Sequence, residues 1–158
     1  MKKKLLVTVG NTLMGDDAAG PLLAQALRRA PLEAWDVLDG GSAPENFLHQ
    51  IREAAPDYVL LVDAADMDLP PGALRWIDAD KLDDPFLMTT HTLPLSYLAQ
   101  ALREFVPRVE LLGIQPHTVA FGYPVCAAVQ EAVRRVYAGL QQSDLTAAGV
   151  LPLEWKSP

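Results

Sequence analysis

The chain has 158 residues, of which 50% are hydrophobic and 21% are charged, and its mean hydropathy is +0.11. These values are typical of one compact domain with a substantial core, and they argue against disordered and fibrous proteins. Twenty acidic residues against thirteen Lys and Arg give a net charge of −7. We therefore expect no nucleic-acid partner, because binding a phosphate backbone needs a basic surface.

The N-terminus and the cysteine content indicate a cytoplasmic protein without a membrane partner. The apolar run at residues 5–9 is too short for a signal peptide or a membrane span. Cys126 is the single cysteine, so the chain forms no internal disulfide.

Five segments have the composition of β-strands, and helical patterns lie between most of them. The segments cover residues 5–9, 36–38, 58–62, 73–77 and 109–114. Residues 58–62 have no polar interruption, which is typical of a parallel strand covered on both faces. Residues 73–77 follow a Pro-Pro-Gly turn and are the candidate for an edge strand, with antiparallel pairing as an open alternative.

Three segments repeat apolar residues at the helical period of 3.6. The predicted apolar faces are Leu22, Leu23, Ala26 and Leu27; Leu95, Leu98, Leu102 and Phe105; and Val125, Val129, Val133, Val136 and Leu140. A further short helix is predicted after Ser42, because Ser42 and Glu45 form a capping-box pattern with Pro44 in the first turn.

The order of these elements predicts an α/β fold. We expect a mostly parallel sheet with helices on both faces. The domain covers residues 1–140, and residues 141–158 form a C-terminal tail whose Leu151, Leu153 and Trp155 can pack back on the body.

Acidic residues gather in the loops that follow the predicted strands. In open α/β sheets, ligands bind beyond the carboxyl ends of the strands. The acidic residues at these positions are Asp16, Asp17, Asp39, Asp63 and Asp66. His91 stands just before a helix, in a loop that can reach the same edge. We expect three carboxylate-bearing loops and one imidazole to converge there.

The first of these loops has the glycine spacing of a phosphate-binding loop but the opposite charge. Gly10 and Gly15 occupy the glycine positions of the motif, whereas Asp16 and Asp17 replace its Lys and its Ser or Thr. Two carboxylates repel a phosphate. The loop is therefore suited to a cation or a proton, unless its aspartates only cap the following helix.

Each of these residues also has a structural explanation. Asp16 or Asp17 can cap the helix that follows, although two adjacent aspartates cannot both do so. Asp63 can form a turn at the end of its strand, and Asp39 can stabilise the glycine turn after it. His91 can cap the helix that it precedes.

Two carboxylates and an imidazole together form a divalent-metal site with open positions, suited to Zn, Ni or Fe. A metal with an open position can activate water for hydrolysis, and a carboxylate alone can act as a general base on water. His117 follows the last parallel strand and can also approach this edge. Cys126 is interpreted as a small buried hydrophobic residue rather than a nucleophile.

At these residues the sequence resembles the endopeptidases that mature nickel–iron hydrogenase large subunits by removing a C-terminal extension after nickel insertion. The matching stretches are residues 9–11, 15–21, 39–46, 62–67, 88–91, 94–98, 112–116 and 123–124. The resemblance runs in order along nearly the whole chain, up to about residue 140. It is greatest to the branch that serves hydrogenases of the formate hydrogenlyase type.

This resemblance implies a three-layer α/β/α fold with a twisted five-stranded sheet. It also implies that Asp17, Asp63 and His91 are the catalytic, metal-contacting trio, with Asp17 at a position that is Glu in some relatives. It thus favours Asp17 over Asp16. The metal would be nickel that is already seated in the large-subunit precursor, where it marks the substrate and is not a permanent cofactor. His117 has no role implied by the resemblance.

Two other functions compete with an endopeptidase. A phosphoacceptor module of the receiver type also has an acidic pair after its first strand and an Asp at the end of its third. Here, however, Asp16 and Asp17 follow a glycine loop, and the last parallel strand leads directly into Gln115 and Pro116, with no Lys there to contact a phosphoryl group. A nickel-binding chaperone without catalysis is the other alternative.

Overall fold

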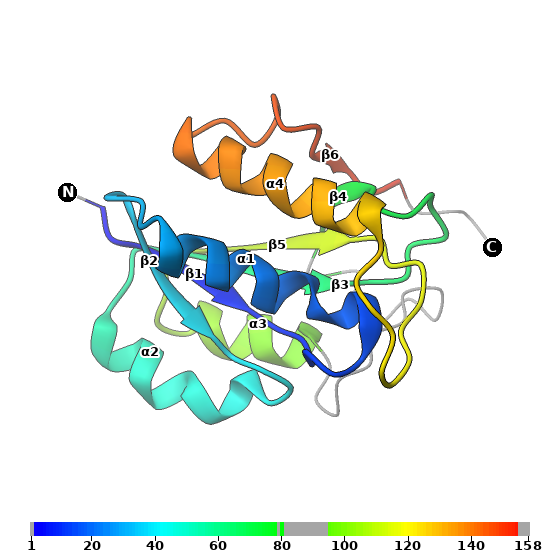
Figure 1. Cartoon of the computed structure of the whole chain (residues 1–158). Coiled ribbons are helices and arrows are strands. Elements are labelled where there is room, and N and C mark those ends of the chain that lie inside the picture. Colours follow the sequence, from blue (N-terminus) through cyan, green and yellow to red (C-terminus); the bar gives the residue numbers. More distant parts are fainter. Residues whose placement is uncertain (1, 79, 81–94, 155–158) are drawn as a thin grey trace.

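The computed structural model describes residues 2–78, 80 and 95–154. One sheet separates two layers of helices, with α1 and α4 on one face and α2 and α3 on the other (Figure 1). The predicted three-layer α/β/α class is confirmed. His91 lies outside the described residues, as do residues 88–90 and Trp155.

The sheet has six strands in the order β2-β1-β3-β5-β4-β6. Their bounds are Lys4–Thr8 (β1), Trp35–Asp39 (β2), Tyr58–Ala64 (β3), Leu74–Ile77 (β4), Arg108–Ile114 (β5) and Leu151–Pro152 (β6). Strands β2, β1, β3 and β5 are parallel to one another, and β4 is antiparallel to β5. The antiparallel alternative for residues 73–77 is therefore the correct one.

The predicted strand count of five was one too low. Residues 151 and 152 of the tail pair in parallel with β4, and the Leu153 N–H donates to the Trp76 carbonyl at 3.0 Å. β4 is consequently next to the edge and not at it. A two-residue strand is too short to show any periodicity, which is why the sequence pattern missed it. Leu153 packs back on the core, whereas Leu151 is 51% exposed.

Three of the four helices, α1, α3 and α4, occur where the periodicity predicted them, and the fourth, α2, is the short helix that was predicted after Ser42. They are α1 (Ala19–Arg29), α2 (Leu48–Ala54), α3 (Leu95–Arg103) and α4 (Ala127–Gln141), and 3₁₀ turns η1 (Gly15–Ala18) and η2 (Pro44–Phe47) precede α1 and α2. The predicted apolar faces are buried at, for example, Leu27, Leu102 and Val136. Within the described residues, no helix is both long and apolar enough to cross a membrane.

The predicted capping box at Ser42 was wrong. Ala43 is the N-cap of η2, and no side chain caps this turn. Pro44 occupies the first position of the turn, where its fixed φ and its missing N–H are both tolerated. The turn η2 therefore begins one residue later than a capping box at Ser42 requires.

Two apolar clusters fill the space between the layers. Leu5, Val7 and Val9 of the first strand region face α2 and α3, whereas Leu6 faces α1 and α4. This alternation follows from the two-residue period of a strand. Because both faces of the central strands are buried, the register of the strands is fixed, and so are the loops that leave their carboxyl ends.

Candidate functional site

The acidic loops predicted from the sequence do meet at one edge of the sheet. This edge is the one toward which the arrowheads of β3 and β5 point in Figure 1. The loops after β1, β2, β3 and β5 all lie there, because these four strands are parallel. The N–H of Val9 donates to the Val62 carbonyl at 2.9 Å, which continues the pairing of β1 with β3 up to the edge.

Glycines bring the first loop close to the end of β1. Gly10 has φ +150°, and a Cβ atom on it would lie 2.0 Å from the carbonyl oxygen of Asp17. A Cβ on Gly20 would lie 2.4 Å from the carbonyl oxygen of Val9. Because glycine has no Cβ atom, η1 and the start of α1 can pack closely against the ends of β1 and β3.

Asp17 is buried, with 2% of its surface exposed, and its carboxylate turns back toward the loop after β1. Its Oδ2 accepts a hydrogen bond from the Asn11 N–H at 2.9 Å. Met14 is the N-cap of η1 and Ala18 that of α1, and neither end has a side-chain cap, so Asp17 is not the helix cap of the structural alternative.

Asp63 is buried to a similar degree, with 3% exposed. It is the sixth residue of β3 and lies opposite Gly113 of β5 in the register. Because η1 packs against β3, the sheet brings the buried carboxylates of Asp17 and Asp63 to the same edge. Among residues 2–78, 80 and 95–154, no group of three or more Cys, His, Asp and Glu forms a metal-binding cluster.

Asp16 has a structural role that the sequence analysis left open. Its side chain is 1% exposed. Its Oδ2 accepts the N–H groups of His117 (2.8 Å) and Thr118 (3.2 Å), and its Oδ1 accepts that of Cys126 (2.7 Å). Asp16 thus fastens both ends of the loop between β5 and α4 to η1.

The pKa of Asp16 reflects two opposing effects. Burial raises it, but the N–H donors of Cys126, His117 and Thr118 stabilise the carboxylate more strongly, so the pKa lies below the usual value for Asp. Asp16 is therefore a permanently charged anchor at neutral pH and not a general acid.

The carboxylates of Asp39 and Asp66 also accept hydrogen bonds from backbone N–H groups. Asp39 Oδ1 accepts the Gly41 N–H at 3.0 Å and the Thr8 hydroxyl at 3.3 Å, so it stabilises the glycine turn as the structural alternative predicted. Asp66 is exposed, and its Oδ1 accepts the Asp68 N–H at 3.1 Å. Neither contact requires a catalytic role.

Gln115 was missed by the sequence analysis. It is buried directly after β5, and its Oε1 accepts the N–H groups of Met67 (2.6 Å) and Leu69 (3.3 Å). Its Nε2 donates to Asp66 Oδ1 at 3.2 Å. Gln115 therefore fixes the loop after β3. The available signal was a polar residue that directly follows a buried strand.

The two remaining candidates are peripheral. His117 is exposed, with its Nδ1 3.0 Å from the Thr118 hydroxyl, and only its backbone contacts Asp16. Cys126 is half-buried at the N-cap of α4. Burial raises the pKa of the Cys126 thiol, and the neighbouring Asp16 carboxylate raises it further. The thiol is thus a poor nucleophile.

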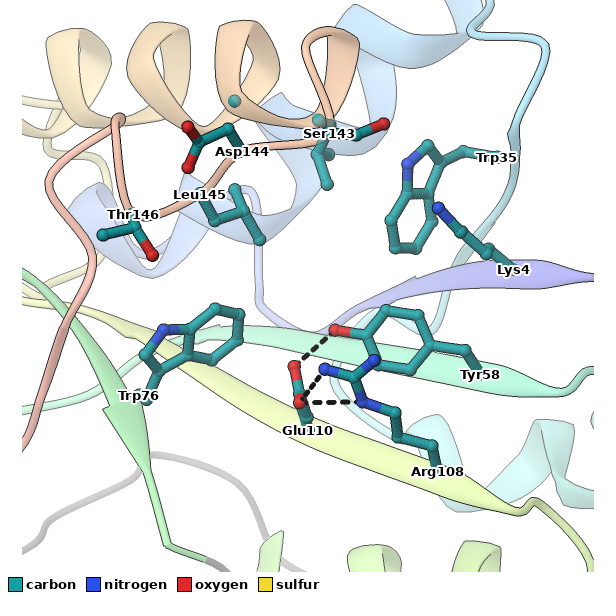
Figure 2. Close-up of a pocket in the computed structure, with 12 residues that line it drawn as sticks. Lys4, Trp35, Tyr58, Trp76, Arg108, Glu110, Ser143, Asp144, Leu145 and Thr146 are labelled. Carbon is teal, nitrogen blue, oxygen red and sulfur yellow. Dashed lines mark hydrogen bonds and ion pairs between the residues drawn. The ribbon is translucent and has the colours of Figure 1, made fainter. Parts of the chain in front are cut away.

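A cavity of about 260 Å³ lies at the opposite, amino-terminal edge of the sheet (Figure 2). Lys4, Trp35, Tyr58 and Arg108, the first residues of β1, β2, β3 and β5, line one side of it. Glu110 accepts hydrogen bonds there from the Tyr58 hydroxyl and the Arg108 guanidinium. Because this cavity lies a full strand length from Asp17 and Asp63, it is not part of the acidic site.

Comparisons with known proteins identify one family. The sequence model of one family, described as hydrogenase maturation protease, matches residues 21–142. The hydrogenase 3 maturation protease of Escherichia coli K12 is 50% identical over 137 residues, which cover 87% of this chain and 88% of that protein. A putative hydrogenase maturation protease of Methanocaldococcus jannaschii is 32% identical over 76% of each chain.

Solved structures agree with this assignment. The solution structure of the endopeptidase HycI from Escherichia coli has a TM-score of 0.88 and 45% identity, covering 99% of each chain. The crystal structure of the hydrogenase maturation protease HycI from Thermococcus kodakarensis has a TM-score of 0.81 and 26% identity, covering 92% of this chain and 93% of that one. These likenesses support peptidase activity and speak against the receiver alternative. The chain therefore belongs to the hydrogenase maturation protease family.

Proposed function

We propose that this protein is an endopeptidase that removes the C-terminal extension from a nickel-loaded hydrogenase large-subunit precursor of the hydrogenase 3, or formate hydrogenlyase, type. The observation that carries the proposal is the pair of buried carboxylates, Asp17 and Asp63, at one sheet edge. The 50% identity to the hydrogenase 3 maturation protease of Escherichia coli supports the choice of substrate.

Nickel belongs to the substrate in this proposal. Asp17 and Asp63 supply carboxylate oxygens and His91 an imidazole nitrogen, a mixed donor set that suits a borderline divalent metal. Three protein donors leave coordination positions for the ligands that the precursor itself provides. Recognition of the metal then ensures that only a loaded precursor is cut, and the protease needs no resident cofactor.

The reaction is hydrolysis of one peptide bond. The oxygen of a water molecule attacks the carbonyl carbon, the C–N bond breaks, and the amine of the released extension takes up a proton. The water is activated either by a carboxylate of the pair, as in an aspartyl-type enzyme, or by the precursor's nickel, as in a metal-dependent one. Both routes place the scissile bond beside Asp17 and Asp63, where burial limits competition from bulk water.

The decisive experiment incubates the purified protein with a large-subunit precursor, with and without nickel, and weighs the products by mass spectrometry. We expect the nickel-loaded precursor alone to lose its C-terminal extension. An uncut nickel-loaded precursor would overturn the proposal. Binding of that precursor without any cleavage would instead identify the protein as a nickel-dependent chaperone.

We also propose a cytoplasmic location. The support is the single, half-buried Cys126, because stabilising disulfides are typical of proteins outside the cytoplasm. Fractionation of cells that express a tagged full-length chain tests this, and recovery in the membrane or periplasmic fraction would contradict it.

A further inference from the structure

Three large apolar side chains are exposed beside the acidic edge. Leu13 is 61% exposed, Phe121 75% and Tyr123 58%. We call these three residues the apolar rim. Single exposed apolar residues are ordinary on protein surfaces, but a group of them next to a site is typical of an interaction surface.

The rim is built from two loops that are far apart in the sequence. Leu13 precedes η1, whereas Phe121 and Tyr123 belong to the loop between β5 and α4. The Gly122 N–H, between the two aromatic residues, donates to the Leu13 carbonyl at 3.0 Å. Gly122 has φ +79°, and the Tyr123 N–H donates to the Ala120 carbonyl at 3.3 Å. A tight turn therefore presents Phe121 at its tip.

Asp16 holds the rim in a fixed position relative to Asp17. The three N–H groups that it binds lie on both sides of the turn that carries Phe121 and Tyr123. The Asp16 N–H also donates to the Thr118 carbonyl at 2.9 Å. The exposed rim is thus anchored to the residue that immediately precedes Asp17.

The described loops that form this edge carry acidic side chains but no basic ones. The described loops at this edge cover residues 9–18, 39–47, 64–73 and 115–126, and they contain no Lys and no Arg. Their acidic residues are Asp16, Asp17, Asp39, Glu45, Asp66 and Asp68. Lys2, Lys3, Lys4, Arg103 and Arg108 lie at the opposite ends of the strands and helices. Arg75 of β4 and Arg135, whose guanidinium donates to the Gly72 carbonyl at 3.0 Å, approach this edge at the loop 64–73, which does not contribute to the rim. A partner surface that covers the rim therefore meets an acidic border.

We propose that the apolar rim docks the folded body of the polypeptide substrate, through a surface patch that is apolar at its centre and basic around it. This inference rests on the proposed function, because it assigns that substrate a second contact away from the scissile bond. The rim would raise the affinity for the whole precursor and position its C-terminus over Asp17 and Asp63. It would contribute little to the hydrolytic step itself.

The test compares the wild type with a triple variant, Leu13→Ser, Phe121→Ser and Tyr123→Ser, on a purified nickel-loaded large-subunit precursor. We expect KM to rise by about 10-fold or more and kcat to change by less than about 2-fold, because uniform binding is lost. The matched control is Leu151→Ser, since Leu151 is 51% exposed and belongs to β6, which is three strands away from β3 and Asp63 in the sheet. The control should leave both parameters unchanged.

The outcomes separate the docking surface from the proposed function. If the wild type cuts no precursor, the proposed function fails. If the wild type cuts and the triple variant keeps the wild-type KM, only the docking surface is overturned. Circular dichroism and a thermal melt establish that the triple variant is folded. KM should also rise between about 50 and about 300 mM salt, and a salt-independent KM would overturn the basic character of the partner.

Discussion

At the scale of single residues, the adjacent aspartates of η1 have different roles. Asp16 accepts three backbone N–H groups from a loop that is 101 to 110 positions away, whereas the Asn11 N–H that donates to Asp17 is only six positions back. Local sequence contains no trace of the distant partners of Asp16. The sequence could therefore identify the acidic pair but could not divide the roles between its members without the family resemblance.

Replacing Asp63 tests the candidate carboxylate pair directly. Asp63→Asn preserves the size of the side chain but removes its charge, so we expect a folded protein whose cleavage of precursor falls by at least about 100-fold. Asp66→Asn, three residues later, is the matched control, because an amide oxygen can still accept the Asp68 N–H. Near-normal cleavage by Asp63→Asn would remove Asp63 from the site.

His91 is the second residue on which the proposed trio depends. Its predicted role stays a prediction, because it lies outside the described residues. We expect His91→Ala to keep the melting temperature of the wild type and to abolish processing of nickel-loaded precursor. Exposed His117 is the matched control, and His117→Ala should process normally. If His91→Ala processed the nickel-loaded precursor as well as His117→Ala does, a role for His91 in recognising the nickel would be contradicted.

Replacing Asp16 should affect stability. Asp16→Ala leaves the N–H groups of His117, Thr118 and Cys126 without their buried acceptor, and we expect a loss of about 3 kcal/mol in the free energy of unfolding. Asp16→Asn keeps one acceptor oxygen and should cost less. Urea unfolding at pH 7 measures both losses. A loss below about 0.5 kcal/mol for Asp16→Ala would contradict the anchoring role.

The pH dependence of stability provides a separate check on Asp16. Its pKa is lowered in the folded protein, so its contribution is fully present above the unfolded-state pKa of about 3.9 and disappears as the pH falls through the lower, folded-state value. The stability difference between wild type and Asp16→Asn should therefore be constant from about pH 7 to about pH 5 and shrink below about pH 4. A constant difference down to about pH 3 would contradict this assignment.

At the scale of elements, long and strongly patterned segments were predictable, and short or irregular ones were not. The unbroken apolar run at residues 58–62 lies inside β3, which extends only two residues further. The two residues of β6 carry no such pattern, and Pro44 displaced the predicted helix start. Residue periodicity reports burial along an element, whereas the ends of elements depend on contacts with other parts of the chain.

The contact between α1 and β1 gives a prediction at this scale. A methyl group on Gly20 would lie 2.4 Å from the Val9 carbonyl oxygen and 3.1 Å from that of Val62, so α1 must move away from the sheet. We expect Gly20→Ala to destabilise the fold by about 2 to 3 kcal/mol, despite the better helix propensity of Ala. Because Asp17 precedes α1, cleavage should weaken as well.

Gly41→Ala is the control for Gly20→Ala. Gly41 has φ +59°, but nothing lies within 4 Å of the added carbon. The substitution should therefore cost only about 1 kcal/mol, through the left-handed backbone conformation. Denaturant midpoints of the two variants give the comparison, and equal losses would mean that the close approach of α1 to β1 is not what requires Gly20.

At the scale of the whole molecule, the two edges of the sheet have different chemistry. The carboxyl edge carries the buried carboxylates and the apolar rim, whereas Lys4, Arg103 and the Tyr58–Glu110–Arg108 network lie at the amino edge. The net charge of −7 is therefore unevenly distributed. Composition established the excess of acidic residues, but only the parallel order of β1, β2, β3 and β5 determined where they gather.

This separation predicts that stability and activity can be changed independently. Glu110→Gln weakens the hydrogen bonds with Tyr58 and Arg108, and because Arg108 is largely exposed we expect a loss of only about 1 kcal/mol, or about 3 °C in Tm. The kcat/KM of Glu110→Gln on precursor should equal that of the wild type. Asp63→Asn, by contrast, should keep the wild-type Tm and lose kcat/KM. A parallel loss of cleavage in Glu110→Gln would mean that the amino edge is coupled to the site, because the sheet between them is otherwise unchanged.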